Sequence, residues 1–426
     1  MTEAEVDTTP PSAPRIGNAA RFLIAATAVS ALGNSMYIGA AALLVLELTR
    51  NPASVPLIAI CGGIPAIVMA PLVPRAIKRF GAGPVAIAAD LVSAATACLY
   101  PLLFLLSIHS GPEIVYAQEL VIGSAAAFYS TSSRILVSAL SANSASVLVR
   151  INGYSIATTQ IAGVIGWGLG ALTLALSDAA TAMFVNAVTF VLSALLQWRV
   201  RDDLRGAQQR GETTVSEEAV SGEAESPAAQ PAPRRWYLPR PSAVIATAVL
   251  VVVFSTTQRL WLSNYPAVLE LVLAKPDWTL GIANVAYSAG AILAGVIVAG
   301  RAKAPTVRST ILVICVFYAL SALVTFTSPL PLMLALYCMV GVASIGAVLA
   351  QSRLQLELPL TSQSTFFARL LAVQNASNLI FLSLWIYLLE LSDPRTLIVI
   401  TLTTAAILTI SFGAAKYDHR AHDVRQ

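Results

Sequence analysis

Five ionisable side chains lie within long apolar stretches of this sequence: Asp90, Glu119, Arg134, Arg259 and Arg353. A charge at the centre of a membrane-spanning helix costs about 2.5–3.5 kcal/mol, so each of these residues is a candidate functional group. A buried carboxyl group can take up and release a proton, whereas an arginine stays charged and pairs with an anion or extends to the membrane surface. These residue types indicate proton exchange and ion pairing.

The first candidate for proton exchange is Glu119. It lies about five residues from the end of the predicted helix 114–136, which places it roughly 8 Å deep at about 1.5 Å per residue. Arg259 lies about a third of the way from one end of the predicted helix 243–266. The sequence leaves two interpretations open. Glu119 exchanges a proton during a working cycle, or Glu119 and Arg259 form a static ion pair.

Asp90 is the second candidate for proton exchange. For this residue, a structural bond to a neighbouring helix or to the basic turn 75–79 is favoured over a coupling role. Arg134 and Arg353 lie at corresponding ends of two predicted helices. We expect them to reach the membrane surface or to form gate contacts, and attraction of an anion is the remaining alternative.

The elements that must hold these residues are apolar helices. Hydrophobic residues make up 57% of the chain and charged residues 11%, against roughly 45–50% and about 25% in an average soluble domain. The apolar runs are continuous and about 20 residues long, which predicts helices rather than barrel strands. The fold class is therefore an all-α polytopic membrane protein with twelve transmembrane helices. The predicted spans are 21–48, 54–74, 83–107, 114–136, 151–176, 179–198, 243–266, 278–299, 309–328, 330–352, 365–389 and 394–414.

A polar segment divides the spans into two six-helix halves. It is rich in Gly, Glu, Ser, Gln and Pro and cannot bury enough apolar surface to offset its ordering entropy. The halves also repeat each other, since Arg134 and Arg150 match Arg353 and Arg369 at an offset of 219 residues. Such pseudo-symmetry is typical of secondary transporters. The predicted organisation is a disordered cytoplasmic N-terminus (1–20), a first half (21–199), a disordered cytoplasmic linker (200–242), a second half (243–415) and a cytoplasmic tail (416–426).

The orientation follows from the positive residues, because cytoplasmic turns retain Lys and Arg. With both termini cytoplasmic, most of the 26 Lys and Arg residues lie on the inner side, and Arg50, Lys275 and Arg395 lie on the outer side. This inner collar facing anionic lipid explains the net charge of +4, which calls for no nucleic-acid partner. The predicted location is a bacterial cytoplasmic (inner) membrane.

Several local motifs are similar to those of a known transporter family. Leu48-Thr49 ends the first span, Pro65 lies within the second, Arg79 and Gly81 lie in the next turn, and Arg150-Ile151-Asn152-Gly153 opens the fifth. With these motifs the chain resembles the major facilitator superfamily, and within it the drug and siderophore exporters of the enterobactin-exporter and macrolide-efflux kind. The resemblance covers the whole layout but specific motifs only in patches.

Departures from the family pattern concern its charged positions. Lys78 stands where the family's inner-gate turn carries an acid, and neutral Asn34 follows Gly33 where an acid is sometimes found. Glu119 stands where related antiporters carry an arginine. The antiporter signature of the fifth span keeps its glycine spacing from Gly166 to Gly170 but lacks its proline.

The resemblance implies a central cavity lined by the first, fourth, seventh and tenth spans, and gates at its two ends. The gate candidates are Arg259, Arg79, Gly81, Arg134 and Arg353. The polar and aromatic residues on the four cavity spans are the candidate substrate contacts, with interhelical bonding as the alternative for each. They are Asn34, Tyr37, Gln118, Tyr129, Gln258, Trp261, Tyr337 and Gln351.

These observations predict a secondary transporter, namely a proton-linked exporter of an amphiphilic drug, siderophore or natural product that works by alternating access. An importer of a small organic solute and a transport-inactive scaffold or receptor are the alternatives. No nucleotide-binding loop occurs and no histidine lies in a span beside a nucleophile, so neither ATP hydrolysis nor an enzyme is predicted. No cofactor or metal is expected. The expected partners are a small molecule, protons and the lipid bilayer, and the chain is expected to be a monomer.

Overall fold

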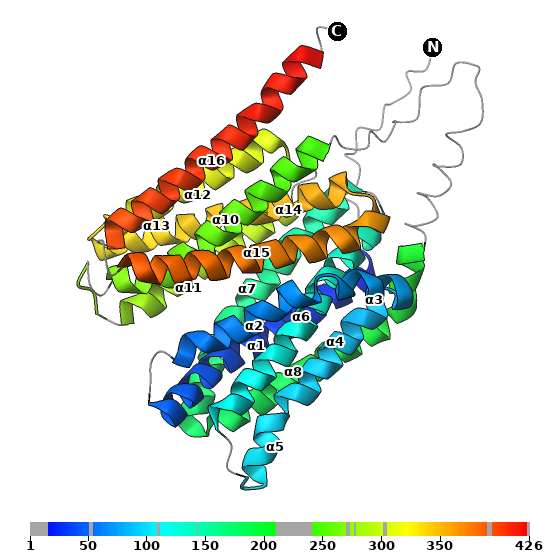
Figure 1. Ribbon diagram of the computed structural model, residues 1–426, viewed down its shortest axis with the longest axis vertical. Coiled ribbons are helices and arrows are strands. Elements are labelled where there is room, and N and C mark those ends of the chain that lie inside the picture. The colour runs from blue at the N-terminus through cyan, green and yellow to red at the C-terminus, as the bar shows by residue number, and fades with distance from the viewer. Residues whose placement is uncertain are drawn as a thin grey trace, which may run out of the picture.

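In the computed structural model, the described residues form helices and the segments that connect them. These residues are 16–50, 54–108, 111–142, 144–209, 241–269, 273–276, 278–300, 305–389 and 394–423. Two groups of helices lie side by side, α1 to α8 and α10 to α16 (Figure 1). The predicted all-α fold with two six-helix halves is confirmed, and these two groups are the first half and the second half below.

The first half packs around α1, which contacts α7 and α8, while α4 packs against α6 and α8. Most of these helices are apolar on all sides because lipid and protein are both apolar neighbours. The helices are α1 (Asn18–Thr49), α2 (Val55–Met69), α3 (Leu72–Phe80), α4 (Ala82–Ala97), α5 (Leu99–Leu105), α6 (Pro112–Leu140), α7 (Ala145–Leu176) and α8 (Ala179–Arg199).

In the second half, α11 packs on α13, and α16 packs on α10 and α12. Its largest core cluster is aromatic, with Phe254, Trp261, Tyr265, Phe317 and Tyr337 all buried. The helices are α10 (Pro241–Ala267), α11 (Trp278–Gly300), α12 (Val307–Thr325), α13 (Leu330–Ala343), α14 (Gly346–Glu357), α15 (Leu360–Leu389) and α16 (Pro394–Asp423).

The number of membrane-crossing helices agrees approximately with the predicted twelve. Among the described residues, ten helical spans are long and apolar enough to cross a membrane, and the bent pair α2 and α3 makes an eleventh. A shorter apolar stretch within α16, Arg395–Ser411, occupies the position of the last predicted span. The bend between α2 and α3 is 64°. It falls at Ala70 and Pro71, and Pro71 has no N–H to donate to the helical hydrogen-bond ladder.

The first residues of the predicted linker 200–242 are ordered. Residues 201–209 form a helix in which Leu204 is fully buried. The Gln208 side-chain oxygen accepts a hydrogen bond of 3.0 Å from the first backbone N–H of α4. These contacts move the start of the linker beyond residue 209, and residues 210–240 lie outside the described part of the chain.

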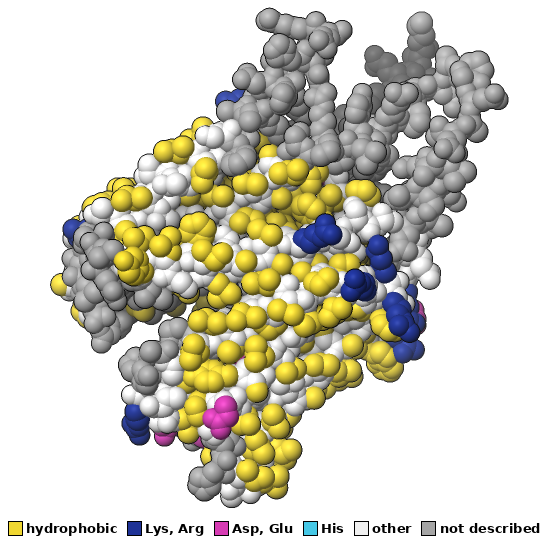
Figure 2. Space-filling model, viewed as in Figure 1, with side chains coloured by type: hydrophobic (Ala, Val, Ile, Leu, Met, Phe, Trp, Pro, Cys, Tyr) yellow, Lys and Arg dark blue, Asp and Glu magenta, His cyan; other side chains and the backbone are white. Residues whose placement is uncertain are grey.

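The outer surface of the bundle is apolar and its charges gather at one end. Large side chains such as Leu105 and Leu176 are almost fully exposed, as expected for a surface that faces lipid rather than water. Lys and Arg gather at one end of the face shown in Figure 2. We call this the basic end. It holds the start of α1, the turn from α3 to α4 and the starts of α7 and α15.

Candidate functional site: a cavity between the halves and its closed basic end

Three polar side chains join the two halves at the basic end. The Asn152 side-chain amide on α7 donates to the Ser352 hydroxyl and to the Gln355 amide oxygen on α14, both at 2.8 Å. Gln355 in turn donates to the Arg134 carbonyl on α6 at 3.0 Å. Asn152, Ser352 and Gln355 are all buried. These neutral hydrogen bonds join α6 and α7 of the first half to α14 of the second half. We call Asn152, Ser352 and Gln355 the polar latch.

Beside the polar latch, the backbones of α7 and α11 come into direct contact. A side-chain carbon placed on Gly153 would lie 2.6 Å from the Ala299 nitrogen and 2.7 Å from the Gly295 oxygen. The Arg150 guanidinium also donates to the Ala299 carbonyl at 3.1 Å. Only glycine at position 153 permits α7 and α11 to lie this close. The glycine of the Arg-Ile-Asn-Gly motif therefore helps to close the basic end.

Arg134 contributes a second link across the closed end. Its guanidinium stacks over the ring of Phe367 on α15, 5.5 Å from the ring centre. A cation over an aromatic face is attracted by the ring quadrupole. Arg134 therefore lies between the two halves.

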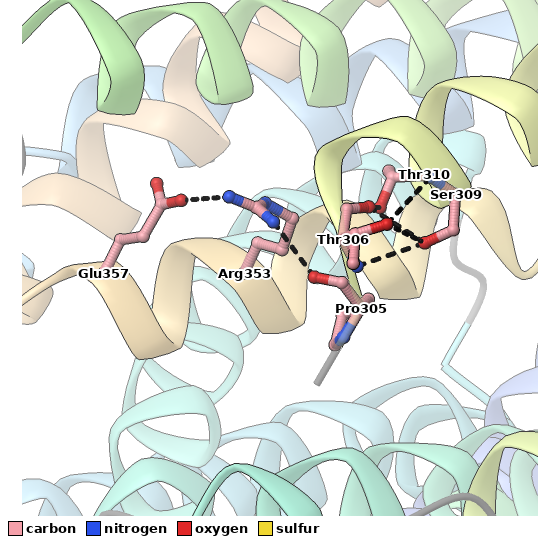
Figure 3. A network of polar contacts seen from close by, with 6 residues as sticks. All are labelled: Pro305, Thr306, Ser309, Thr310, Arg353 and Glu357. Carbon is pink, nitrogen blue, oxygen red and sulfur yellow. Dashed lines mark hydrogen bonds and ion pairs between the residues drawn. The ribbon is translucent and has the colours of Figure 1, made fainter. Parts of the chain in front are cut away.

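Arg353 is the sequence equivalent of Arg134, and its hydrogen bonds and ion pair to described residues lie within the second half (Figure 3). It donates to the Pro305 carbonyl at 2.9 Å and pairs with Glu357 at 2.5 Å. Next to it, Thr306 and Ser309 form a capping box that starts α12. Arg353 thus ties α14 to the start of α12, and the pseudo-symmetry of the sequence is not repeated in the contacts.

Two more gate candidates, Arg79 and Gly81, lie at the basic end, where α3 ends and turns into α4. Arg79 is exposed and stacks on Phe80, with 5.2 Å between the guanidinium carbon and the ring centre. Gly81 ends α3 with a positive φ of 86°, a conformation that favours glycine. Gly81 also lines a pocket at this end together with Leu360, Thr361 and Ser364 of α15, so it lies close to the second half.

A cavity of about 500 Å³ lies between the halves, near the middle of the helices that line it. Figure 2 shows the surface indented between the halves at the end opposite the basic one. The first half supplies α7, and the second half supplies α10, α11 and the break between α13 and α14. The lining residues are Ile156, Gln160, Gln258, Arg259, Leu262, Tyr287, Ala291, Ser344, Ile345, Ala347 and Val348.

Two residues proposed from the sequence line this cavity. Gln258 donates to the Tyr287 hydroxyl at 2.8 Å, and Arg259 is exposed beside it. Arg259 and Glu119 form no ion pair, because Glu119 packs against helices of its own half. The static pair is therefore absent from this conformation.

The other predicted substrate contacts are placed elsewhere. Trp261 and Tyr337 stack on each other, 5.2 Å apart, in the aromatic core of the second half. Gln118 is buried and donates to the Thr96 carbonyl on α4, and the Tyr129 hydroxyl bonds Thr27 on α1. These four side chains hold helices together, so for them the interhelical alternative describes the structure. Asn34 and Gln351 are half-buried and are not among the lining residues, and Tyr37 is buried against Glu119.

Glu119 lies in a polar niche formed by α1, α2 and α6. One carboxylate oxygen would be 3.0 Å from a side-chain carbon placed on Gly62 of α2, so the missing side chain makes room for it. The Tyr37 hydroxyl lies beside the carboxylate and has no other partner among the described residues. Glu119 itself is half-buried. The niche therefore holds the carboxyl group of a residue that is partly exposed.

Asp90 differs from Glu119 in being enclosed and held by hydrogen bonds. One of its oxygens accepts hydrogen bonds from the Ser193 hydroxyl and the Gln197 amide, both at 2.6 Å, and the side chain is 2% exposed. Both donors lie on α8, the neighbouring helix. This is the interhelical bond that the sequence favoured over coupling.

We expect Asp90→Ala to destabilise the protein by about 1–3 kcal/mol without abolishing transport per folded molecule, because two buried donors lose their acceptor. The unfolding temperature of the purified chain in detergent would fall. Asp202→Ala, on an exposed side chain, is the matched control. Unchanged stability together with lost transport would instead assign Asp90 a coupling role.

Sequence reasoning missed most of the residues that build the site. The latch residues Ser352 and Gln355 and the cavity residues Gln160, Tyr287 and Ser344 are not among the predicted site residues, and Asn152 is noted only as part of a motif. One signal was available, because Asn152, Ile156 and Gln160 follow each other at intervals of four and share one face of α7. Gly166 and Gly170 both lie against the backbone of α1, where a side-chain carbon would collide with the Leu32 oxygen at the first position and lie 3.1 Å from the Met36 Cα at the second.

Two six-helix halves that enclose a cavity closed at one end are the architecture of a membrane transporter. The model of the Major Facilitator Superfamily matches residues 23–350, which is more than half of the 426 residues. The chain belongs to this superfamily, whose members are secondary transporters that work by alternating access.

Solved structures agree with this assignment at the level of the fold. The human organic anion transporter MFSD10 (TETRAN) is 12% identical, with a TM-score of 0.63 over 94% of this chain and 99% of that chain. The proton:xylose symporter XylE, bound to 6-bromo-6-deoxy-D-glucose, is 11% identical, with a TM-score of 0.65 over 93% of this chain and 95% of that chain. No curated protein matches the sequence.

Proposed function

We propose that this chain is a proton-linked exporter of an amphiphilic small molecule. The observation that carries the proposal is the cavity between the halves, which both halves line and the polar latch separates from the basic end. Six of its lining residues are apolar and four are neutral and polar, which suits a bulky amphiphile better than a sugar or a small ion. Breaking the hydrogen bonds of the polar latch while closing the opposite end would open the cavity to the other side of the membrane and so carry the substrate across.

The orientation and location belong to the same proposal. The basic end faces the cytoplasm, since positive residues are retained there, and both termini are cytoplasmic. The membrane is a bacterial inner membrane and the chain works as a monomer. In this orientation the structure is the outward-facing state. The drug and siderophore exporters remain the branch that the motifs of the first, second and fifth spans favour.

Glu119 is the proposed proton carrier. This residue is partly exposed and its carboxyl group has one polar neighbour, Tyr37, whereas Asp90 is enclosed by two donors. A group that must gain and lose a proton in each cycle needs access to water in at least one state. Glu119 meets this condition better than Asp90.

An importer and a transport-inactive scaffold are the other functions compatible with this fold. One of the two similar structures is a proton:xylose symporter, so this fold is compatible with import as well as export. A scaffold needs no accessible carboxyl group and no cavity between its halves. The features of Glu119 and of the cavity therefore favour transport.

The test is accumulation of amphiphilic drugs and siderophores in efflux-deficient cells that express the chain, with and without a protonophore. We expect accumulation of at least one compound to fall, and the protonophore to restore it. Increased accumulation would identify an importer. No change across a broad panel, with the protein present in the membrane, would favour a scaffold.

A further inference from the structure

Arg259 is the one charged residue among those that line the cavity between the halves. A guanidinium stays charged at any pH that a cell experiences, and holding a cation within a membrane costs free energy unless it is paired. Neither a hydrogen bond nor an ion pair joins Arg259 to another described residue, and its side chain is exposed to the cavity. The cavity therefore contains a positive charge without a protein counter-charge in the described part of the chain.

Most neighbours of Arg259 in the cavity lining are hydrogen-bonded or apolar, and the neutral side chain of Gln160 is the exception. Gln258 donates to the Tyr287 hydroxyl at 2.8 Å, so these two polar groups satisfy each other. The apolar wall of the cavity includes Ile156, Leu262 and Val348. The volume of about 500 Å³ is within the range of roughly 300–1,000 Å³ found for small-molecule sites. A ligand that matches this lining has an apolar body and one anionic group.

A second cation lies between the halves, toward the basic end. Arg134 is held between α6 and α15, with its guanidinium over Phe367 and one buried nitrogen that has no hydrogen-bond partner. Opening the basic end separates these helices and exposes Arg134. An anion that leaves or enters through that end would then meet a positive charge at both stages, whereas a cation would be repelled at both.

We propose that the substrate is an amphiphilic organic anion whose carboxylate or sulfonate pairs with Arg259, a substrate class that rests on the proposed transport function. Arginine suits this task because its planar donors match a carboxylate in two parallel hydrogen bonds. Glu119 is the competing partner, since a movement of the halves could bring it to Arg259. Pairing with Glu119 would give no preference among ligand charges, which makes the two roles separable.

The test uses three probes with the same ring and different head groups: 1-naphthaleneacetate, 2-(1-naphthyl)ethanol and 2-(1-naphthyl)ethylammonium. Binding to the purified full chain in detergent is measured as a rise in unfolding temperature, because a ligand that binds the folded state stabilises it. We expect the acetate to stabilise the wild type most. Arg259→Gln should weaken acetate binding by about tenfold or more, and Arg259→Lys should retain part of the affinity.

Arg50→Gln is the matched control, because Arg50 is exposed at the end of α1 and lies outside the cavity. It should leave acetate binding unchanged. Equal stabilisation by all three probes, stronger stabilisation by the ammonium compound, no stabilisation by any probe at millimolar concentration, or acetate binding that survives Arg259→Gln would overturn the proposal.

This measurement does not depend on transport. Acetate binding that requires Arg259, found together with no export or import of any compound, would refute the proposed function and leave the anion site standing. Transport that prefers cations and is indifferent to Arg259→Gln would refute the anion site alone.

Discussion

Gly153→Leu should abolish transport while leaving a folded protein in the membrane. In the closed state, the first carbon of any side chain at 153 would lie within 3.0 Å of three backbone atoms of α11, which cannot move aside as a flexible side chain would. Overpacking of this kind costs about 1–3 kcal/mol or more. The cost falls on the state in which α7 and α11 touch, so the equilibrium shifts by up to roughly a hundredfold toward a state open at the basic end.

Accessibility at the basic end measures this shift. Ser352 is 1% exposed in the closed state, so a cysteine introduced there (Ser352→Cys) should resist a hydrophilic maleimide in a chain whose native cysteines are replaced by serine. Adding Gly153→Leu should make position 352 reactive. Gly168→Leu is the matched control on the same helix, because no atom lies within 4 Å of a side-chain carbon placed there. Normal transport by Gly153→Leu, or a protected position 352, would contradict the closure described above.

The architecture could be predicted because its causes are local in the sequence. A run of about 20 apolar residues is long enough to cross the bilayer wherever it occurs, and turns and proline set its ends. The same reasoning fails at α2 and α3, where one predicted span is two helices. Pro65 lies within α2 without dividing it, while Pro71 marks the break. Proline alone does not determine which of the two positions bends.

The residues of the site were harder to predict because membrane helices are apolar on all sides. In a soluble helix the polar face shows which side meets water, but α10 gives no such signal. Gln258 lines the cavity and Trp261 lies in the aromatic core, although they are three residues apart on one helix. Packing of neighbouring helices, which single-sequence reasoning does not see, decides between them.

Internal repeats were informative about layout and misleading about contacts. Arg134 and Arg353 occupy matching sequence positions, and symmetry predicts matching roles. Glu357 lies four residues after Arg353 and captures it within its own half, while the position four residues after Arg134 is Ser138. Without a local acid, Arg134 is available to stack on Phe367 across the interface. The presence of Glu357 thus explains why Arg353 bonds within its own half, whereas Arg134 contacts the other half.

Glu119→Gln should reduce proton-driven transport to the level of cells that lack the chain, while substrate exchange without a proton gradient continues. Glutamine has the size of glutamate and can still accept a hydrogen bond from Tyr37, so the niche between α1, α2 and α6 is preserved. It cannot take up or release a proton, so a cycle that requires this step stops. Proteoliposomes with an imposed pH gradient measure the driven flux, and counterflow of labelled against unlabelled substrate measures exchange.

Glu113→Gln is the matched control for that experiment, because Glu113 is an exposed carboxylate in the first turn of the same helix. It should leave both fluxes unchanged. Since exchange needs substrate binding and movement of the halves but no net proton transfer, its survival in Glu119→Gln separates coupling from structure. Loss of both fluxes would make Glu119 a structural residue of the niche. Driven transport at the wild-type rate would remove Glu119 from the mechanism and leave the proton path to another group.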